Sequence, residues 1–146
     1  MSNDGFKVWS LNGSQLWESL DEGVTWTQIA AFPSKPVDAI RQLDNGELLL
    51  VLNNTTTNLR DVVRSEGYGT SSLTWVDCFS TSAIRVNITA AWSISVYKNI
   101  ILMAEYGPKA GEPWGGATAA EGENARYVRM STDYGKTWKI IFDLNA

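Results

Sequence analysis

The chain has 146 residues and a hydrophobic fraction of 44%, which is enough to form the core of one domain. It contains no His and a single Cys, and its formal net charge is −4. These features argue against a His-based catalytic or metal site, an internal disulfide, and nucleic-acid binding through a basic face. No apolar run approaches the length of a membrane helix.

Short β-type runs separated by turn residues occur along the whole chain, whereas helical periodicity is hard to find. The first part predicts three strands, in Phe6–Leu11, Gln15–Glu18 and Thr25–Ala30. The middle part predicts four strands, in Val37–Leu43, Glu47–Leu52, Asp61–Arg64 and Leu73–Phe79. The last part predicts four more strands, in Ala91–Tyr97, Ile100–Tyr106, Arg126–Met130 and Thr137–Leu144.

These groups form an internal repeat with units of about 1–31, 36–79 and 83–146, aligned on Trp26, Trp75 and Trp138. We therefore expect a single all-β domain over residues 1–146. It would consist of antiparallel four-stranded blades in a β-propeller-like partial ring of about three blades. The first unit offers only three strands. The apolar runs at 48–52 and 100–104 are expected to lie in the core.

Two segments share the pattern S-x-D-x-G-x-T-W, each between two β-type runs. The first contains Ser19, Asp21, Gly23, Thr25 and Trp26, and the second contains Ser131, Asp133, Gly135, Thr137 and Trp138. A degenerate copy keeps Ser65, Thr74 and Trp75 but has a longer turn and no Asp. The pattern resembles the Asp-box, or BNR repeat, of the sialidase superfamily of β-propellers.

The chemistry of the motif is that of a tight hairpin turn. The Ser and Asp side chains can accept hydrogen bonds from turn N–H groups, and Gly permits a backbone angle that other residues resist. Trp can pack between neighbouring turns or blades. In the family the box lies away from the catalytic centre, so the resemblance implies a structural role. Ligand or metal binding by Asp21 and Asp133 is the alternative.

The catalytic residues of the related enzymes have no counterpart in this chain. The family resemblance implies a cluster of three Arg, a Tyr nucleophile with a carboxylate partner, an acidic proton donor and an Arg-Ile-Pro segment. The sequence has no Arg-Ile-Pro, and none of its six Arg lies in a recognisable family context. Three blades are also too few to close a ring. We expect no catalytic residues, no metal and no cofactor, and a buried, inert thiol at Cys78.

Binding is expected at the end of the blades opposite the S-x-D-x-G-x-T-W turns, because the long loops fall there. The longest is Gly107–Asn124, which contains Trp114 outside any strand pattern. Trp114 either covers the end of its own blade or anchors a protein partner or sugar. The candidate binding residues beside it are Tyr106, Arg126 and Tyr127.

A partial ring would leave sheet faces and edges that need a cover. We expect that the chain is not an enzyme but a structural or interaction protein. It would act through protein partners or as a homo-oligomer, as in a bacteriophage virion component of the head, collar or tail. A glycan-binding lectin of sialidase-like propeller fold is the alternative. The N-terminus lacks a signal-peptide core, so the expected location is a virion or the cytoplasm, with no membrane or nucleic-acid partner.

Overall fold

The computed structural model describes residues 6–56, 59–79, 90–108 and 124–143, and in this part of the chain it contains strands but no helix. The first sheet contains β1 (Val8–Asn12), β2 (Gln15–Ser19) and β3 (Thr27–Ala31). The middle sheet contains β4 (Val37–Gln42), β5 (Leu48–Asn54), β6 (Leu59–Glu66) and β7 (Thr74–Asp77). The last sheet contains β8 (Ala90–Tyr97), β9 (Ile100–Pro108), β10 (Asn124–Ser131) and β11 (Lys139–Asp143).

Each sheet is an antiparallel meander in which consecutive strands are neighbours. All eleven predicted runs overlap an observed strand, and the predicted all-β class of antiparallel sheets with three or four strands is confirmed. The main differences are at strand ends. For example, β6 extends beyond the predicted Asp61–Arg64 because its pairing with β5 continues to Leu59. The propeller-like closure of the ring stays a prediction.

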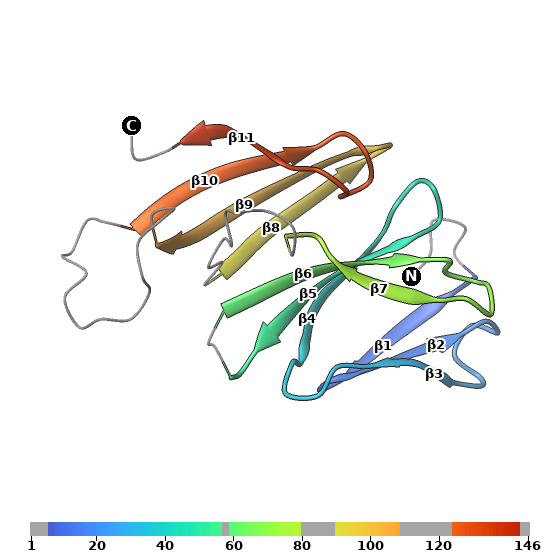
Figure 1. The fold of residues 1–146 in the computed structure, drawn as a ribbon. Coiled ribbons are helices and arrows are strands. Elements are labelled where there is room, and N and C mark those ends of the chain that lie inside the picture. Colours follow the sequence, from blue (N-terminus) through green and yellow to red (C-terminus); the bar gives the residue numbers. More distant parts are fainter. Residues whose placement is uncertain (1–5, 57–58, 80–89, 109–123, 144–146) are drawn as a thin grey trace.

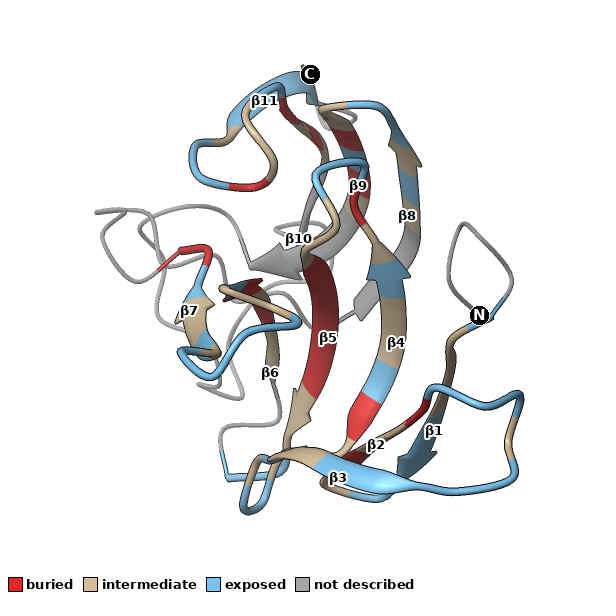
Figure 2. Ribbon diagram, turned by 90° about the vertical axis from the view of Figure 1, so that its right-hand side faces the viewer, coloured by how far each residue is buried: buried red, intermediate tan, exposed pale blue. Residues whose placement is uncertain are grey.

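The three sheets follow one another in space as they do in sequence, with the middle sheet between the other two (Figure 1). Successive side chains of a strand point to opposite faces of its sheet. Leu48, Leu50 and Leu52 of β5 pack toward the first sheet, together with Leu16 of β2. Leu49 and Val51 of the same strand pack toward the last sheet. The prediction that residues 48–52 lie in the core is therefore confirmed, and both faces of β5 are covered. β5 is the most continuously buried strand in Figure 2.

The prediction for residues 100–104 is correct for one face only. Ile101 and Met103 of β9 are fully buried against the middle sheet, but Leu102 between them is 38% exposed. The reason is the position of the sheet at the end of the series, where only one of its faces has a neighbouring sheet (Figure 1). An apolar run in the sequence indicates a strand, but it does not show how many sheets cover it.

Two aromatic pairs join the sheets. Phe32, just after β3, contacts Trp75 of β7 edge-on with ring centroids 5.5 Å apart. Phe79, just after β7, contacts Trp138 before β11 with ring centroids 5.4 Å apart. In both pairs the Trp belongs to the later sheet and the Phe follows the last strand of the earlier one. The same kind of contact therefore holds both internal boundaries between sheets.

Candidate functional site

The first S-x-D-x-G-x-T-W turn connects β2 to β3 and is held by its own side chains. The Gly23 amide donates to Ser19 Oγ at 2.7 Å, and the Thr25 amide donates to Asp21 Oδ1 at 2.8 Å. The Thr25 hydroxyl donates to Asp21 Oδ2 at 2.6 Å, and Ser19 Oγ donates to Asp21 Oδ1 at 2.7 Å. Trp26 Nε1 donates back to the Gly23 carbonyl at 3.0 Å.

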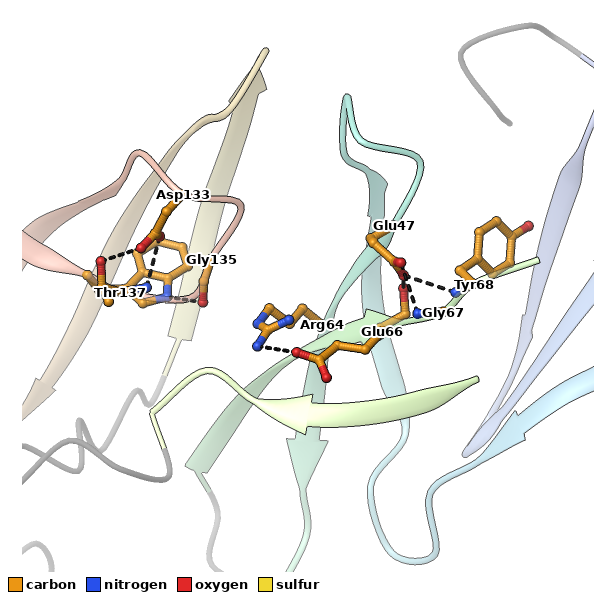
Figure 3. Close-up of polar contacts among 10 residues, drawn as sticks. Glu47, Arg64, Glu66, Gly67, Tyr68, Asp133, Gly135 and Thr137 are labelled. Carbon is orange, nitrogen blue, oxygen red and sulfur yellow. Dashed lines mark hydrogen bonds and ion pairs between the residues drawn. The ribbon is translucent and has the colours of Figure 1, made fainter. Parts of the chain in front are cut away.

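The second turn, between β10 and β11, repeats this arrangement almost atom for atom (Figure 3). Gly135 donates to Ser131 Oγ at 2.8 Å, and Thr137 donates to Asp133 through its amide at 2.9 Å and its hydroxyl at 2.6 Å. The Trp138 indole donates to the Gly135 carbonyl at 2.9 Å. Gly135 has a φ of +81°, in the left-handed region that favours glycine, and Gly23 has a φ of +96°.

The carboxylates of both turns are held in their ionised form. Hydrogen bonds from the Thr25 hydroxyl, the Thr25 amide and Ser19 lower the pKa of Asp21 from 3.8 to about 2. Partial burial acts to raise the pKa of Asp133, but the hydrogen bonds from Thr137 and Ser131 together outweigh it and lower that pKa. Both oxygens of each carboxylate already accept hydrogen bonds within the turn, which favours the structural role over ligand binding.

The degenerate turn between β6 and β7 has no Asp of its own, and a carboxylate from another part of the chain takes its place. Glu47 precedes β5 and accepts hydrogen bonds from the Gly67 amide at 2.9 Å and the Tyr68 amide at 3.1 Å (Figure 3). It also accepts a short hydrogen bond from Ser65 Oγ, the equivalent of Ser19 and Ser131. This role of Glu47 was not predicted from the sequence. The sequence does contain a clue. Glu47 directly precedes the strand that pairs with β6, and the turn after β6 lacks the Asp of the S-x-D-x-G-x-T-W pattern.

The turns share one end of the sheets with the hairpin of residues 97–100, as the alternation of a meander requires. Asn99 Nδ2 donates to the Thr132 carbonyl at 2.5 Å, and the Tyr134 amide donates to the Asn99 carbonyl at 3.5 Å. The candidate residue Trp114 lies outside the described residues. Three other candidates lie on paired strands, where Arg126 of β10 is opposite Tyr106 of β9 and is followed by Tyr127.

A groove with a volume of about 820 Å³ lies where the first strands of the three sheets approach one another. Its lining includes Trp9 from β1, Arg41 and Asp44 at the end of β4, and Tyr97 and Lys98 at the end of β8. The groove was not predicted from the sequence, because its walls come from three units that are far apart in the chain. Groups of three or more acidic or Cys side chains suited to a metal ion are absent from the described residues.

Two arginines lie in the boundary between the middle and last sheets. Arg64 of β6 forms an ion pair with Glu66, with 2.7 Å between Nη2 and Oε1 (Figure 3). Arg129 of β10 is buried, and its guanidinium lies 5.7 Å from the centroid of the Phe79 ring. Burial raises the pKa of the nearby Cys78 thiol to about 12, and the charge of Arg64 offsets only part of that effect. The predicted buried position of Cys78 is confirmed.

In the part of the chain that the structure describes, the large exposed hydrophobic side chains belong to the two outer sheets and the segments beside them. Among the described residues five lie in the first sheet or the segments around it: Phe6, Leu11, Leu20, Val24 and Trp26. Five more lie in the last sheet or its turns: Tyr97, Leu102, Ile140, Ile141 and Phe142. The described part of the middle sheet contributes none. Most of the exposed apolar surface therefore lies on the two outer sheets, although Tyr97 lines the groove and Leu11 is on the side of the first sheet that faces the middle sheet.

No helix in the described residues is long and apolar enough to cross a membrane. No protein-family model matches the sequence, and a search of curated proteins finds no significant match.

Proposed function

We propose that the chain is a non-catalytic interaction module, built as a partial Asp-box β-propeller, that becomes part of a larger protein assembly. A structural component of a bacteriophage virion, on the head, collar or tail, is the setting that we propose. The supporting observation is the position of its exposed apolar side chains, which lie on the two outer sheets and are absent from the described part of the middle one. Exposed apolar surface of this kind is typical of protein–protein contacts.

The ionisation state of the two Asp side chains in the S-x-D-x-G-x-T-W turns supports a role without catalysis. A glycosidase needs one carboxyl group that stays protonated at working pH and a second carboxylate across the scissile bond. The pKa of Asp21 is lowered to about 2 and that of Asp133 is also lowered, so neither is a proton donor at neutral pH. Their oxygens are occupied by Thr25 and Thr137. This arrangement stabilises a turn, and it removes Asp21 and Asp133 as candidates for the proton donor.

The virion setting is tested on particles. Cells that express the chain from its own gene are lysed, and assembled particles are separated from free protein on a density gradient. We expect peptides of the chain in the particle fractions at a constant ratio to the major shell protein, with the free-protein fractions of the same gradient as the control. A chain found only among the free proteins would refute the virion assignment. Hydrolysis of sialosides by the purified chain would refute the non-catalytic assignment.

Glycan binding is the second candidate, and the groove at the first strands supports it. Trp9 and Tyr97 provide aromatic surface there, and Arg41 and Asp44 provide charged hydrogen-bonding groups. Sugars are bound by this combination of aromatic faces and polar groups. Binding to a glycan array that is lost in Tyr97→Ala would place the sugar in the groove, because Tyr97 is 68% exposed and its truncation leaves the core intact. Loss in Trp114→Ala instead would place it at the Gly107–Asn124 loop.

A further inference from the structure

A Phe–Trp contact occurs at both internal boundaries between sheets, and each outer sheet carries one of the two residues of that contact without its partner. At each internal boundary a Trp of the later sheet packs on a Phe of the earlier sheet, as in Phe32–Trp75 and Phe79–Trp138. The first sheet carries the next Trp in this series, Trp26, without an earlier sheet to pack on. The last sheet carries the next Phe, Phe142, without a later sheet beyond it.

The alignment of the last sheet with the middle sheet supports this equivalence. Phe79 and Phe142 both lie four residues after the Trp of their own turn, but Phe79 is 7% exposed and Phe142 is 62% exposed. Leu49 pairs with the residue before Ser65, and Leu102 pairs with the residue before Ser131. Leu49 is 1% exposed and Leu102 is 38% exposed. The outer face of the last sheet is therefore equivalent to the face of the middle sheet that packs on the last sheet.

The outer face of the first sheet has the complementary character. Trp26 hydrogen-bonds to its own turn as Trp138 does, yet it is 39% exposed, whereas Trp138 packs against the core between two sheets. Val8 pairs with Ser19, just as Ile101 pairs with Ser131, and Ile101 is fully buried against the middle sheet. Among the described residues, no further sheet covers Val8 in this way. We call this the Trp26 face, and the outer face of the last sheet the Phe142 face.

We propose that copies of this chain associate head to tail, with the Trp26 face of one copy packed on the Phe142 face of the next. The inference rests on the proposed interaction function and identifies the partner as a second copy. Two Phe side chains are exposed among the described residues, Phe6 and Phe142, and only Phe142 lies four residues after the Trp of a turn, as Phe79 does at an internal boundary. Two copies joined at both ends would form a ring of six sheets, within the range of roughly four to eight blades found in closed propellers. The contact is heterologous, since two different surfaces meet.

The test is analytical ultracentrifugation of the purified chain over a concentration series. We expect association to twice the chain mass of 16.1 kDa. Trp26→Ala and Phe142→Ala should each raise the dissociation constant at least about tenfold, because truncation of a central aromatic residue removes much of the binding energy of an interface. Leu11→Ala is the matched control, because Leu11 is 37% exposed in the first sheet but lies on the same side as Trp9, toward the middle sheet.

Mixing the two variants distinguishes head-to-tail packing from a symmetric contact. An equimolar mixture of Trp26→Ala and Phe142→Ala can form one contact between intact faces, so it should associate more strongly than either variant alone. Weakening by Trp26→Ala but not by Phe142→Ala would overturn the proposal, since it would show that two Trp26 faces pack on each other. A wild-type chain that stays monomeric across the series would also overturn it.

A variant that gains affinity guards against loss of folding as the explanation. Glu22 lies at the position that Tyr134 occupies in the second turn, with nearly the same φ, +58° and +59°. Tyr134 packs against the core between the middle and last sheets, whereas Glu22 is exposed. Glu22→Tyr should therefore lower the dissociation constant. A dissociation constant that is unchanged or higher would count against the proposed face. A monomeric chain that is still incorporated into particles would refute self-association and leave the interaction function standing.

Discussion

The carboxylate of Glu47 should stabilise the middle sheet more than any exposed acidic residue does. Replacement by Ala removes the acceptor for the Gly67 amide, the Tyr68 amide and the Ser65 hydroxyl. A hydrogen bond to a charged group contributes about 1.5–3 kcal/mol, and an unsatisfied buried group costs about 1–3 kcal/mol. The turn amides are only half-buried and regain water in part, whereas Ser65 is 0% exposed. We therefore expect Glu47→Ala to lower the free energy of unfolding by about 2–4 kcal/mol.

The assay is urea unfolding followed by Trp fluorescence, with the transition midpoint compared between variants. With an m-value of about 1–3 kcal/mol/M, the expected loss moves the midpoint down by roughly 1–2 M. Glu47→Gln keeps one acceptor oxygen and should lose about half as much. Asp44→Ala, an exposed change in the hairpin that precedes Glu47, serves as the control and should stay within about 0.5 kcal/mol of wild type. A Glu47→Ala variant as stable as that control would refute the argument that Glu47 replaces the missing Asp.

Three further predictions concern the Trp and Asp residues of the two complete turns and the buried Cys78. Trp138→Ala should lower the free energy of unfolding by about 2–4 kcal/mol, because Trp138 packs between two sheets. Trp26→Ala should lower it by less than about 1 kcal/mol in the dilute monomer, because Trp26 does not pack between two sheets. Equal losses for the two variants in urea unfolding would contradict this prediction. The pKa of Asp21 is lowered from 3.8 to about 2, so its contribution to stability is present above pH 3.8 and is lost as the pH falls toward 2, and Asp21→Asn should flatten the loss of stability over that interval. The lowered pKa of Asp133 acts in the same direction. If the free energy of unfolding of Asp21→Asn fell with decreasing pH as steeply as that of wild type, the Asp21 carboxylate would be excluded as the cause of the pH dependence. Cys78, with its pKa raised to about 12, should react with a thiol reagent at pH 8 only as fast as the chain unfolds, and rapid labelling of the folded chain would disprove its burial.

The strands and the two complete turns could be predicted from the sequence because their determinants are local. Alternating or continuous apolar runs specify where a strand lies, and Gly and Asp residues between them specify the turns. The hydrogen bonds of the first turn join residues at most four apart, from Ser19 to Gly23 and from Asp21 to Thr25. A pattern of eight residues therefore contains both donors and acceptors. The pattern does not specify contacts with the rest of the molecule, such as the surface on which its Trp packs or the hydrogen bond from Asn99 to the Thr132 carbonyl of the second turn.

The candidate sites show where local reasoning ends. Glu47 acts on a turn 18 to 21 positions later in the chain, and that pairing exists because β5 and β6 are neighbours. The groove combines β1, β4 and β8, which come from three different units. Neither can be found by spacing, since the distance along the chain between the participating residues carries no fixed pattern. Loop length instead predicted a binding site in the Gly107–Asn124 segment, where Trp114 lies outside the described residues.

By itself, the sequence determined the strands, their antiparallel order within each unit and the hydrogen-bonded chemistry of the S-x-D-x-G-x-T-W turns. The tertiary structure alone decided which faces are covered. Leu49 and Leu102 occupy equivalent positions in similar runs, yet only Leu49 is buried, because the middle sheet has neighbours on both sides and the last sheet has one. Burial depends on what packs against a strand, and the period of two along the strand specifies only which side chains share a face.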